Sequence, residues 1–413
     1  MSVFEANMCS FLKKRWTEWA LSETGYSWLF FLSWGVWLVT RMMQETALLD
    51  AAPLSIVTKA ALLWCIGLLA IFEILSLNRY GARDLVALCI FALLLISAIH
   101  CGDKNLIYGF VYIYCARKIS FKKISKFTLG VLACSLVMIL SASYLALLPD
   151  TVLGSSDGRN RISLGFAWPS RPSNYLLTIS MLYIYCRGRR ITVFELSAII
   201  LIAVQFFLWT DSRNPLLCTF VLVILLLIFK IMPTLMNWKI VAFLCGGSFI
   251  LCAGVMVILT AQYDPQNQLL AYLNSIMSGR LQFSNVALST SGFSLFGTDV
   301  LDVAAGDFDH ATTGFLDSSY LRLLLIFGAI PFFLIVGSLT KLTFAAEKRG
   351  EVCLVACLVC VAVHGLMEGQ LALLWYTPFL FLLGHWFDGA FLADGVTLAR
   401  NKCGKRANGV RCF

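Results

Sequence analysis

Arginine side chains recur in the short polar stretches that interrupt this strongly apolar chain. The stretch "GRNRISLGFAWPSRPSN" at 158–174 carries three of them, and "TDSRN" and "SGRLQ" carry one each. A guanidinium group is a planar fork of donors that binds phosphate through two hydrogen bonds at once, which Lys does not. Several such groups near helix ends would bind a pyrophosphate headgroup at the membrane surface. The candidate residues are Arg159, Arg161, Arg171, Arg213, Arg280 and Arg322.

Each of these arginines also has a simpler explanation. A loop arginine can be solvated or can pair with a nearby acid, and Asp150, Asp157 and Asp211 are close in the sequence. Arg322 lies about one turn inside an apolar segment, where an ionisable residue is costly and therefore a functional candidate. Its side chain could instead snorkel to nearby headgroups. The sequence leaves both interpretations open.

Groups that could move a proton are few, because the chain has only four His residues. His310 lies in "GDFDHATTGFLDSSYL" shortly before Asp317, and either residue could be the catalytic base toward an acceptor hydroxyl. His364 and Glu368 are four residues apart in "HGLMEG", so they share one face of a helix end. That spacing suits a substrate-binding or catalytic pair, but a structural polar contact is favoured over catalysis.

The elements that must position these residues are membrane helices. Of 413 residues, 59% are hydrophobic and only 13% are charged, with a mean hydropathy of +0.82. Ordinary globular domains carry roughly a quarter charged residues, so the composition excludes a soluble protein. A helix that crosses a bilayer needs about 17–25 apolar residues, and we expect about twelve such spans. Their centres are Trp34, Gly67, Leu93, Tyr112, Val137, Met181, Ala203, Leu225, Phe249, Ile330, Ala356 and Leu380.

The basic residues predict the orientation of these spans. Lys and Arg predominate in alternate connections, and the positive-inside rule then puts both termini in the cytoplasm and the arginine-bearing stretches outside. The net charge of +9 therefore reflects topology and attraction to anionic lipid, not nucleic-acid binding. Most of the 15 cysteines lie in apolar runs without acidic or His partners. Neither a metal site nor a disulfide framework is expected.

The chain is expected to form one integral membrane domain over residues 1–413. Its one long connection, 262–315, falls outside between the ninth and tenth spans, and such long loops tend to be functional or disordered. The apolar stretch "LLAYLNSIM" within it predicts a short amphipathic helix on the membrane surface. We therefore expect this extracytoplasmic loop to be partly helical.

The order of these stretches resembles a known family. "LGFAWPSRPSNYLL" is followed by "TDSRNPLL", by "SGRLQF", by "DSSYLRLLLIFGAIPFFL" and by "HGLMEGQLALLWYTPFLFLL". This series, over roughly residues 150 to 385, looks like the bacterial Wzy-type polysaccharide polymerases, in the superfamily that includes the O-antigen ligases. The resemblance lies in pattern and order and not in a rigid motif.

The resemblance implies a GT-C-like glycosyltransferase in the bacterial inner membrane. It would join oligosaccharide repeat units carried on undecaprenyl pyrophosphate into O-antigen, capsule or exopolysaccharide, with no metal and no cofactor. By position, Arg159 or Arg161, Arg213 and Arg280 would contact the pyrophosphate, and His310 or Asp317 would lie near the acceptor hydroxyl. The implied partners are the lipid-linked oligosaccharides, membrane lipids, a chain-length regulator and a flippase, and no nucleic acid.

Two alternatives belong to other reactions or classes. An O-antigen ligase would transfer finished glycan to lipid A core, but "ATTGFLDSS" after His310 departs from the ligase pattern and favours a polymerase. The family's common "HPN" is also replaced, by Trp168, Pro169 and Ser170, with Asn174 displaced. A flippase or transporter of lipid-linked sugars would show repeat symmetry and broken helices at the bilayer midplane, and neither is evident in the sequence.

Overall fold

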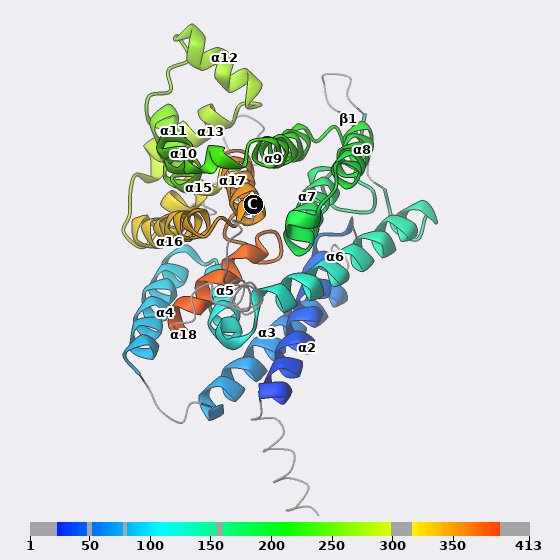
Figure 1. The fold of residues 1–413 in the computed structure, drawn as a ribbon, viewed down its shortest axis with the longest axis vertical. Coiled ribbons are helices and arrows are strands. Elements are labelled where there is room, and N and C mark those ends of the chain that lie inside the picture. Colours follow the sequence, from blue (N-terminus) through cyan, green and yellow to red (C-terminus); the bar gives the residue numbers. More distant parts are fainter. Residues whose placement is uncertain are drawn as a thin grey trace, which may run out of the picture.

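The computed structural model describes residues 23–47, 52–76, 81–150, 152–154, 160–298 and 316–388, and in these the protein is mainly α-helical (Figure 1). The α-helices are α2 Glu23–Gln44, α3 Ala52–Ser76, α4 Ala82–Cys101, α5 Asn105–Cys115, α6 Phe121–Tyr144, α7 Ser170–Arg187, α8 Val193–Thr210, α9 Arg213–Ile231, α10 Lys239–Gly246, α11 Ser248–Ala261, α12 Gln268–Ile276, α13 Arg280–Ser291, α15 Ser319–Leu321, α16 Ala329–Lys348, α17 Val352–His364 and α18 His385–Asp388. Short 3-10 or π turns are η2 Ala116–Lys118, η3 Gly188–Arg190, η4 Pro233–Asn237, η5 Arg322–Phe327 and η6 Pro378–Gly384.

Five helices in the described part of the chain are long and apolar enough to cross a membrane, namely α4, α6, α8, α9 and α16. The pair α10 and α11 would be a sixth span, bent by 64°. The break falls at Gly246 and Gly247, and glycine pairs are common sites of sharp kinks. At Gly246 a Cβ atom would collide with the Phe344 ring, so glycine also lets α10 approach α16 closely. The apolar helices indicate a membrane-embedded protein.

Other apolar segments are shorter than the sequence predicts. The segment centred on Tyr112 forms the helix α5 of only 11 residues, about 16 Å long at 1.5 Å per residue. The segment centred on Leu380 forms the 3-10 turn η6 and the four-residue α18, preceded by turns over 365–377. Pro378 lacks the amide hydrogen that a continuous helix through this region would need. These two segments therefore differ from the full-length spans that were expected.

The segment centred on Ile330 is broken near its start. A π-helical turn, η5, covers Arg322–Phe327, and α16 begins only after Gly328. Gly328 has a φ of 99° and lies so close to the backbone of Gly297 that a Cβ atom on it would clash. Arg322 thus lies three residues after the helical segment begins at Ser319, and the crossing of residues 294–298 separates this segment from α16 at Gly328.

The polar connections between helices gather at two ends of the bundle. One, here called the site end, contains residues 45–47, 102–104, 160–169, 211–212 and 365–377. It is joined by ion pairs of Arg171 with Glu45 and of Arg322 with Asp103. The opposite end contains residues 116–120, 188–192, 232–238 and 349–351, joined for example by the bond from Arg189 to the Gly350 carbonyl. The helices that connect the two ends therefore run in alternating directions, with α10 and α11 counted as one bent segment.

A small antiparallel hairpin closes one connection at the site end. Strands β1 Val152–Gly154 and β2 Asn160–Ile162 pair with Val152 opposite Ile162. Beyond the hairpin, Phe166 forms an isolated bridge with Thr46, so the connection before α7 is tied to the end of α2. In the expected outer loop, "LLAYLNSIM" contributes to helix α12, and α13 follows it.

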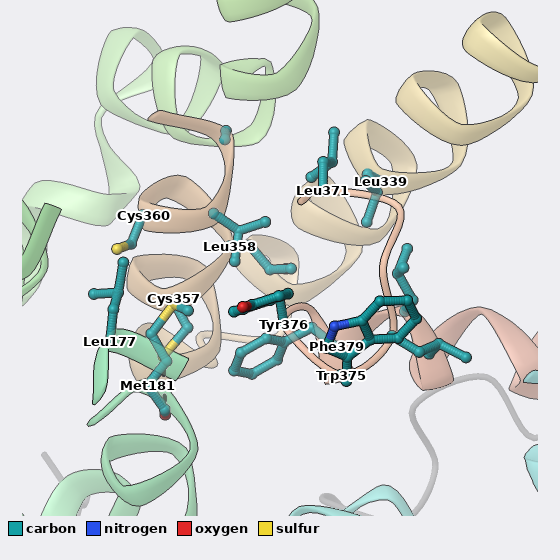
Figure 2. Close-up of a cluster of buried hydrophobic side chains, with 14 of the residues drawn as sticks. Leu177, Met181, Leu339, Cys357, Leu358, Cys360, Leu371, Trp375, Tyr376 and Phe379 are labelled. Atoms are coloured by element: carbon teal, nitrogen blue, oxygen red, sulfur yellow. Dashed lines mark hydrogen bonds between the residues drawn. The ribbon is translucent and has the colours of Figure 1, made fainter. Parts of the chain in front are cut away.

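Helix α17 is part of the buried core, and Figure 2 shows its Cys357, Leu358 and Cys360 in a cluster of buried side chains. Its side chains from Leu354 to Ala362 are almost all fully buried, and it packs on α7, α9, α11 and α16. Small cysteines permit this close packing: the thiols of Cys357 and Cys360 lie 3.4 Å from the carbonyls of Met181 and Cys218. The end of α17, His364, is therefore held firmly at the site end.

A buried ion pair stabilises the opposite end. Arg117 contacts Glu73 with both side chains less than a tenth exposed, and the Tyr26 hydroxyl lies 2.7 Å from Glu73 Oε2. Removing one member of a buried pair leaves a desolvated charge and costs about 3–5 kcal/mol. We predict that Glu73→Ala markedly lowers the thermal midpoint of the detergent-purified protein, whereas Lys118→Ala on the same turn does not. Equal midpoints for Glu73→Ala and the wild type would contradict this role.

Candidate functional site

Hydrogen bonds at the site end join two segments that are far apart in the sequence, residues 317–322 and residues 364–371. The Ser319 amide donates to the Gly365 carbonyl at 2.9 Å, and the Ser319 hydroxyl donates to the Glu368 carbonyl. The Leu371 amide in turn donates to Ser319 Oγ at 2.9 Å. These hydrogen bonds hold the turn that follows α17 against the start of α15. It thereby brings the side chains of residues 317–322 beside those of residues 364–371.

An asparagine joins the two predicted polar residues of the "HGLMEG" turn. Asn174 Nδ2 donates to Glu368 Oε2 at 3.1 Å, and Asn174 Oδ1 lies 3.2 Å from His364 Nε2. The acceptor role of Oδ1 requires that His364 carry its proton on Nε2. Asn214, at the start of α9, donates to the His364 carbonyl at 3.5 Å. Side chains of α7 and α9 therefore both bond to the end of α17 or the turn after it, and Asn174 reaches the half-buried Glu368 carboxylate in that turn.

The Glu368 carboxyl group is held close to its titration point at neutral pH. Removal of water by burial raises its pKa to about 7, and the nearby Asp317 raises it further. Arg280, the Asn174 hydrogen bond and Arg171 oppose this shift by favouring the charged form. A carboxyl group with a pKa near 7 can accept or release a proton under physiological conditions. Groups with such shifted pKa values cluster at functional sites.

Arg280 comes from the connection between the ninth and tenth predicted spans. Its Nε lies 3.0 Å from Asp317 Oδ2. It is the first residue of α13 and follows Gly279, which has a φ of 82° that an L-residue rarely adopts. The Asp317 side chain keeps 43% of its surface exposed, so this ion pair faces an accessible space.

Arg171 belongs to a polar network between α2, α7 and the turn before η6. Its guanidinium lies 3.5 Å from Glu45 Oε1. The Tyr376 hydroxyl also donates to Glu45, and the Trp375 indole donates to it at 3.1 Å. The Arg41 guanidinium packs over the Trp375 ring at 4.5 Å, a cation–π contact. The network fixes the orientation of Arg171 beside the Glu368 turn.

Arg322 lies beside the residue that follows Glu368. Its guanidinium is 3.6 Å from Asp103 Oδ2, at the connection between α4 and α5. A Cβ atom on Gly369 would lie 3.6 Å from Arg322 Nη1, which places this arginine against the residue that follows Glu368. Three arginines from separate segments, Arg171, Arg280 and Arg322, therefore lie near the Glu368 turn, and Arg171 and Arg280 favour the charged form of its carboxyl group.

The remaining predicted residues lie elsewhere. Arg161, on β2, donates to the Thr210 carbonyl at 3.1 Å, at the tight turn between α8 and α9. Arg213 is exposed at the first position of α9, beside that turn. Both are at the site end, beside the turn between α8 and α9. Arg159 and His310 lie outside the described residues.

Several residues of this network were not identified from the sequence. They are Arg41, Glu45, Asp103 and Asn174, together with Asn105, whose side-chain oxygen accepts a hydrogen bond from Arg41 at 2.9 Å. A signal existed for one pair: Arg41 and Glu45 are four residues apart at the end of an apolar segment, where they share a helix face. Asn174 was noted as a displaced asparagine, but its contact with Glu368 spans 194 positions and no local pattern reveals it.

Within the described ranges, no group of three or more His, Cys, Asp or Glu side chains is arranged to hold a metal ion. The polar groups of the site end instead alternate in charge, with arginines facing carboxylates. Such an arrangement can bind an anion by exchanging carboxylate partners for it and can transfer a proton through Glu368. No family model, curated protein or solved structure matches this chain.

The pKa of Glu368 predicts a pH-dependent stability. Because the folded state raises this pKa from 4.5 to about 7, folding favours the protonated form. The stability that this gives is fully present below about pH 4.5 and is lost as the pH rises through 7. Glu368→Gln stays neutral at every pH. As the pH rises from 5 to 8, its free energy of unfolding should therefore increase relative to that of the wild type by about 3 kcal/mol. Thermal midpoints of both proteins, measured across this pH range, check the difference. Parallel curves for both proteins would show that Glu368 is ionised normally.

Proposed function

We propose that this protein is a metal-independent polysaccharide polymerase. It extends surface polysaccharide by joining oligosaccharide repeat units carried on undecaprenyl pyrophosphate, at the outer face of the bacterial cytoplasmic membrane. One observation carries the proposal: a half-buried carboxylate, Glu368, lies at one end of an apolar helix bundle among arginines from three separate segments. This combination supports a site for an anionic, lipid-anchored donor next to a proton acceptor.

The proposed topology follows from the same arrangement. Twelve apolar segments of a GT-C-like fold cross or enter the membrane, both termini are cytoplasmic and the site end faces outward. The alternating direction of the helices and the gathering of the predicted outer arginines at one end support this topology. The short segments α5 and η6–α18 lie against other helices, where irregular backbone can be tolerated within a membrane protein.

In the proposed reaction, the arginines bind the pyrophosphate of the donor. The acceptor is the non-reducing end of a repeat unit on a second carrier. Its hydroxyl gives its proton to Glu368 while its oxygen forms a bond with the anomeric carbon of the donor sugar. The bond between that carbon and the phosphate oxygen breaks, and undecaprenyl pyrophosphate leaves with both electrons. Guanidinium groups aimed at the leaving group stabilise the negative charge that develops.

The carboxylate partners of the arginines have a defined place in this scheme. Asp317 and Glu45 hold Arg280 and Arg171 in position before the donor arrives. The exposed Arg280–Asp317 pair can open toward a phosphate, which binds a guanidinium more strongly than a solvated carboxylate contact does because it carries more charge. Opening would free Asp317 near the acceptor, so Asp317 is a second candidate base. Arg161 and Arg213 extend the positive surface toward the α8–α9 turn.

The arginine contribution can be tested with a purified, reconstituted protein and synthetic lipid-linked repeat units. Arg280→Ala should reduce chain extension at least 100-fold, and Arg280→Lys should restore it only in part, because Lys cannot bind phosphate through two parallel hydrogen bonds. Product length is read on gels or by mass spectrometry. Arg190→Ala, an exposed cation at the opposite end, is the matched control and should behave as wild type.

Three outcomes would reject the polymerase proposal. If the single variants Arg280→Ala and Arg213→Ala both extend chains normally, these arginines do not bind the donor. Wild-type protein that leaves repeat units single but transfers finished glycan to lipid A core would be a ligase. Movement of the lipid-linked unit across the vesicle membrane without any new glycosidic bond would identify a flippase.

The role of Glu368 predicts a pH profile. If the ionised carboxylate accepts the hydroxyl proton, the rate should rise with pH through an apparent pKa near 7 and then level off. Glu368→Gln should lose about 100-fold or more in rate at every pH and should lose this rise as well. Glu368→Asp should keep the rise at a lower rate. A pH profile that Glu368→Gln leaves unchanged would transfer the role of base to another group.

A further inference from the structure

An apolar groove with a volume of about 390 Å³ runs between α4, α5, α16 and the segment η6–α18. It is large enough for part of a small-molecule ligand. Its lining is aliphatic and aromatic except for Arg83 and Ser338. Because α4 and α16 are both long and apolar enough to cross a membrane, the groove lies at the depth of lipid chains. Figure 1 shows α4, α5 and α18 together, below α16.

One wall of the groove is a stripe along α4. Arg83, Val86, Ile90 and Leu94 all line it, and their spacing puts them on one helix face. From Arg83 to Leu94 the helix rises about 16 Å, close to half of the roughly 30 Å hydrocarbon core of a bilayer. The groove therefore has the depth of one leaflet. Its cation is at the opposite end of the bundle from Glu368.

The facing wall lies on α16, which runs in the opposite direction. Leu334 and Ser338 line the groove, and Lys341 continues the same face one turn later. The Lys341 ammonium lies 4.9 Å from the centre of the Trp386 ring, which is itself part of the lining. Two antiparallel stripes thus place their cations, Arg83 and Lys341, at the same mouth of the groove.

We infer that this groove binds an acyl chain of an anionic phospholipid whose phosphate is held by Arg83 and Lys341. The apolar walls can bury the acyl chain. The two cations lie at the opposite end of the bundle, where they can contact the phosphate of a lipid in the leaflet at that end. Burial of methylene groups gives affinity without selectivity, whereas the cations select anionic over zwitterionic lipid. The site is separate from Glu368 and does not depend on the proposed reaction.

Native mass spectrometry of the full-length protein in detergent micelles tests this site. The probes are phosphatidylglycerol and phosphatidylcholine with identical acyl chains. The wild type should retain one phosphatidylglycerol in preference to phosphatidylcholine. The double variant Arg83→Ala/Lys341→Ala should bind phosphatidylglycerol about 30-fold more weakly, since each cation contributes about fivefold at an anionic surface. Arg190→Ala is the matched control and should keep the preference.

A second variant tests the groove itself. Ser338→Trp should fill the groove and reduce the retention of both lipids. If Ser338→Trp fails to fold, Arg83→Glu is tested in its place and should reverse the preference for phosphatidylglycerol over phosphatidylcholine. Equal binding of both lipids by the wild type, or unchanged preference in the double variant, would overturn the proposal. So would displacement of phosphatidylglycerol by an equal concentration of a polyprenyl phosphate, which would make this a groove for the substrate chain.

Discussion

A charge cannot lie half-buried among apolar helices unless other groups compensate for its lost hydration. Glu368 is such a group, and much of the site end is arranged around it. Asn174 bonds its carboxylate, Ser319 bonds its backbone, and Arg171 and Arg280 lower the cost of its ionised form. Compensation is incomplete, so the carboxyl group is nearly balanced between two protonation states.

The irregular backbone around this carboxyl group is a consequence of the same constraint. A regular helix through 365–377 satisfies its own hydrogen bonds and has none to offer to neighbouring segments. The observed turns instead direct the carbonyls of Gly365 and Glu368 toward Ser319. The π-helical turn η5 holds Arg322 against Gly369 in a similar way. The irregular turns are anchored on α17, which is buried and packs regularly on α7, α9, α11 and α16.

The two ends of the bundle use charge differently. At the opposite end the Arg117–Glu73 pair is buried and closed, which suits a structural role. At the site end, Arg280 and Asp317 remain partly exposed, so their partners can be exchanged. The apolar groove between α4, α5, α16 and η6–α18 has a third arrangement, with two cations at its mouth. Charge exposure therefore separates structural pairs from candidate binding groups.

The sequence by itself determined the helical class, because hydropathy and helical period are local properties of the chain. It also identified Arg171, Arg280 and Glu368 as unusual, since ionisable residues beside apolar runs are costly wherever they fold. Only the tertiary structure decided which of them meet. The bond from Asn174 to Glu368 depends on the packing of α7 against α17, and the break at Gly328 depends on the crossing of residues 294–298. Contacts between distant segments are set by packing in three dimensions, and no local pattern in one sequence encodes them.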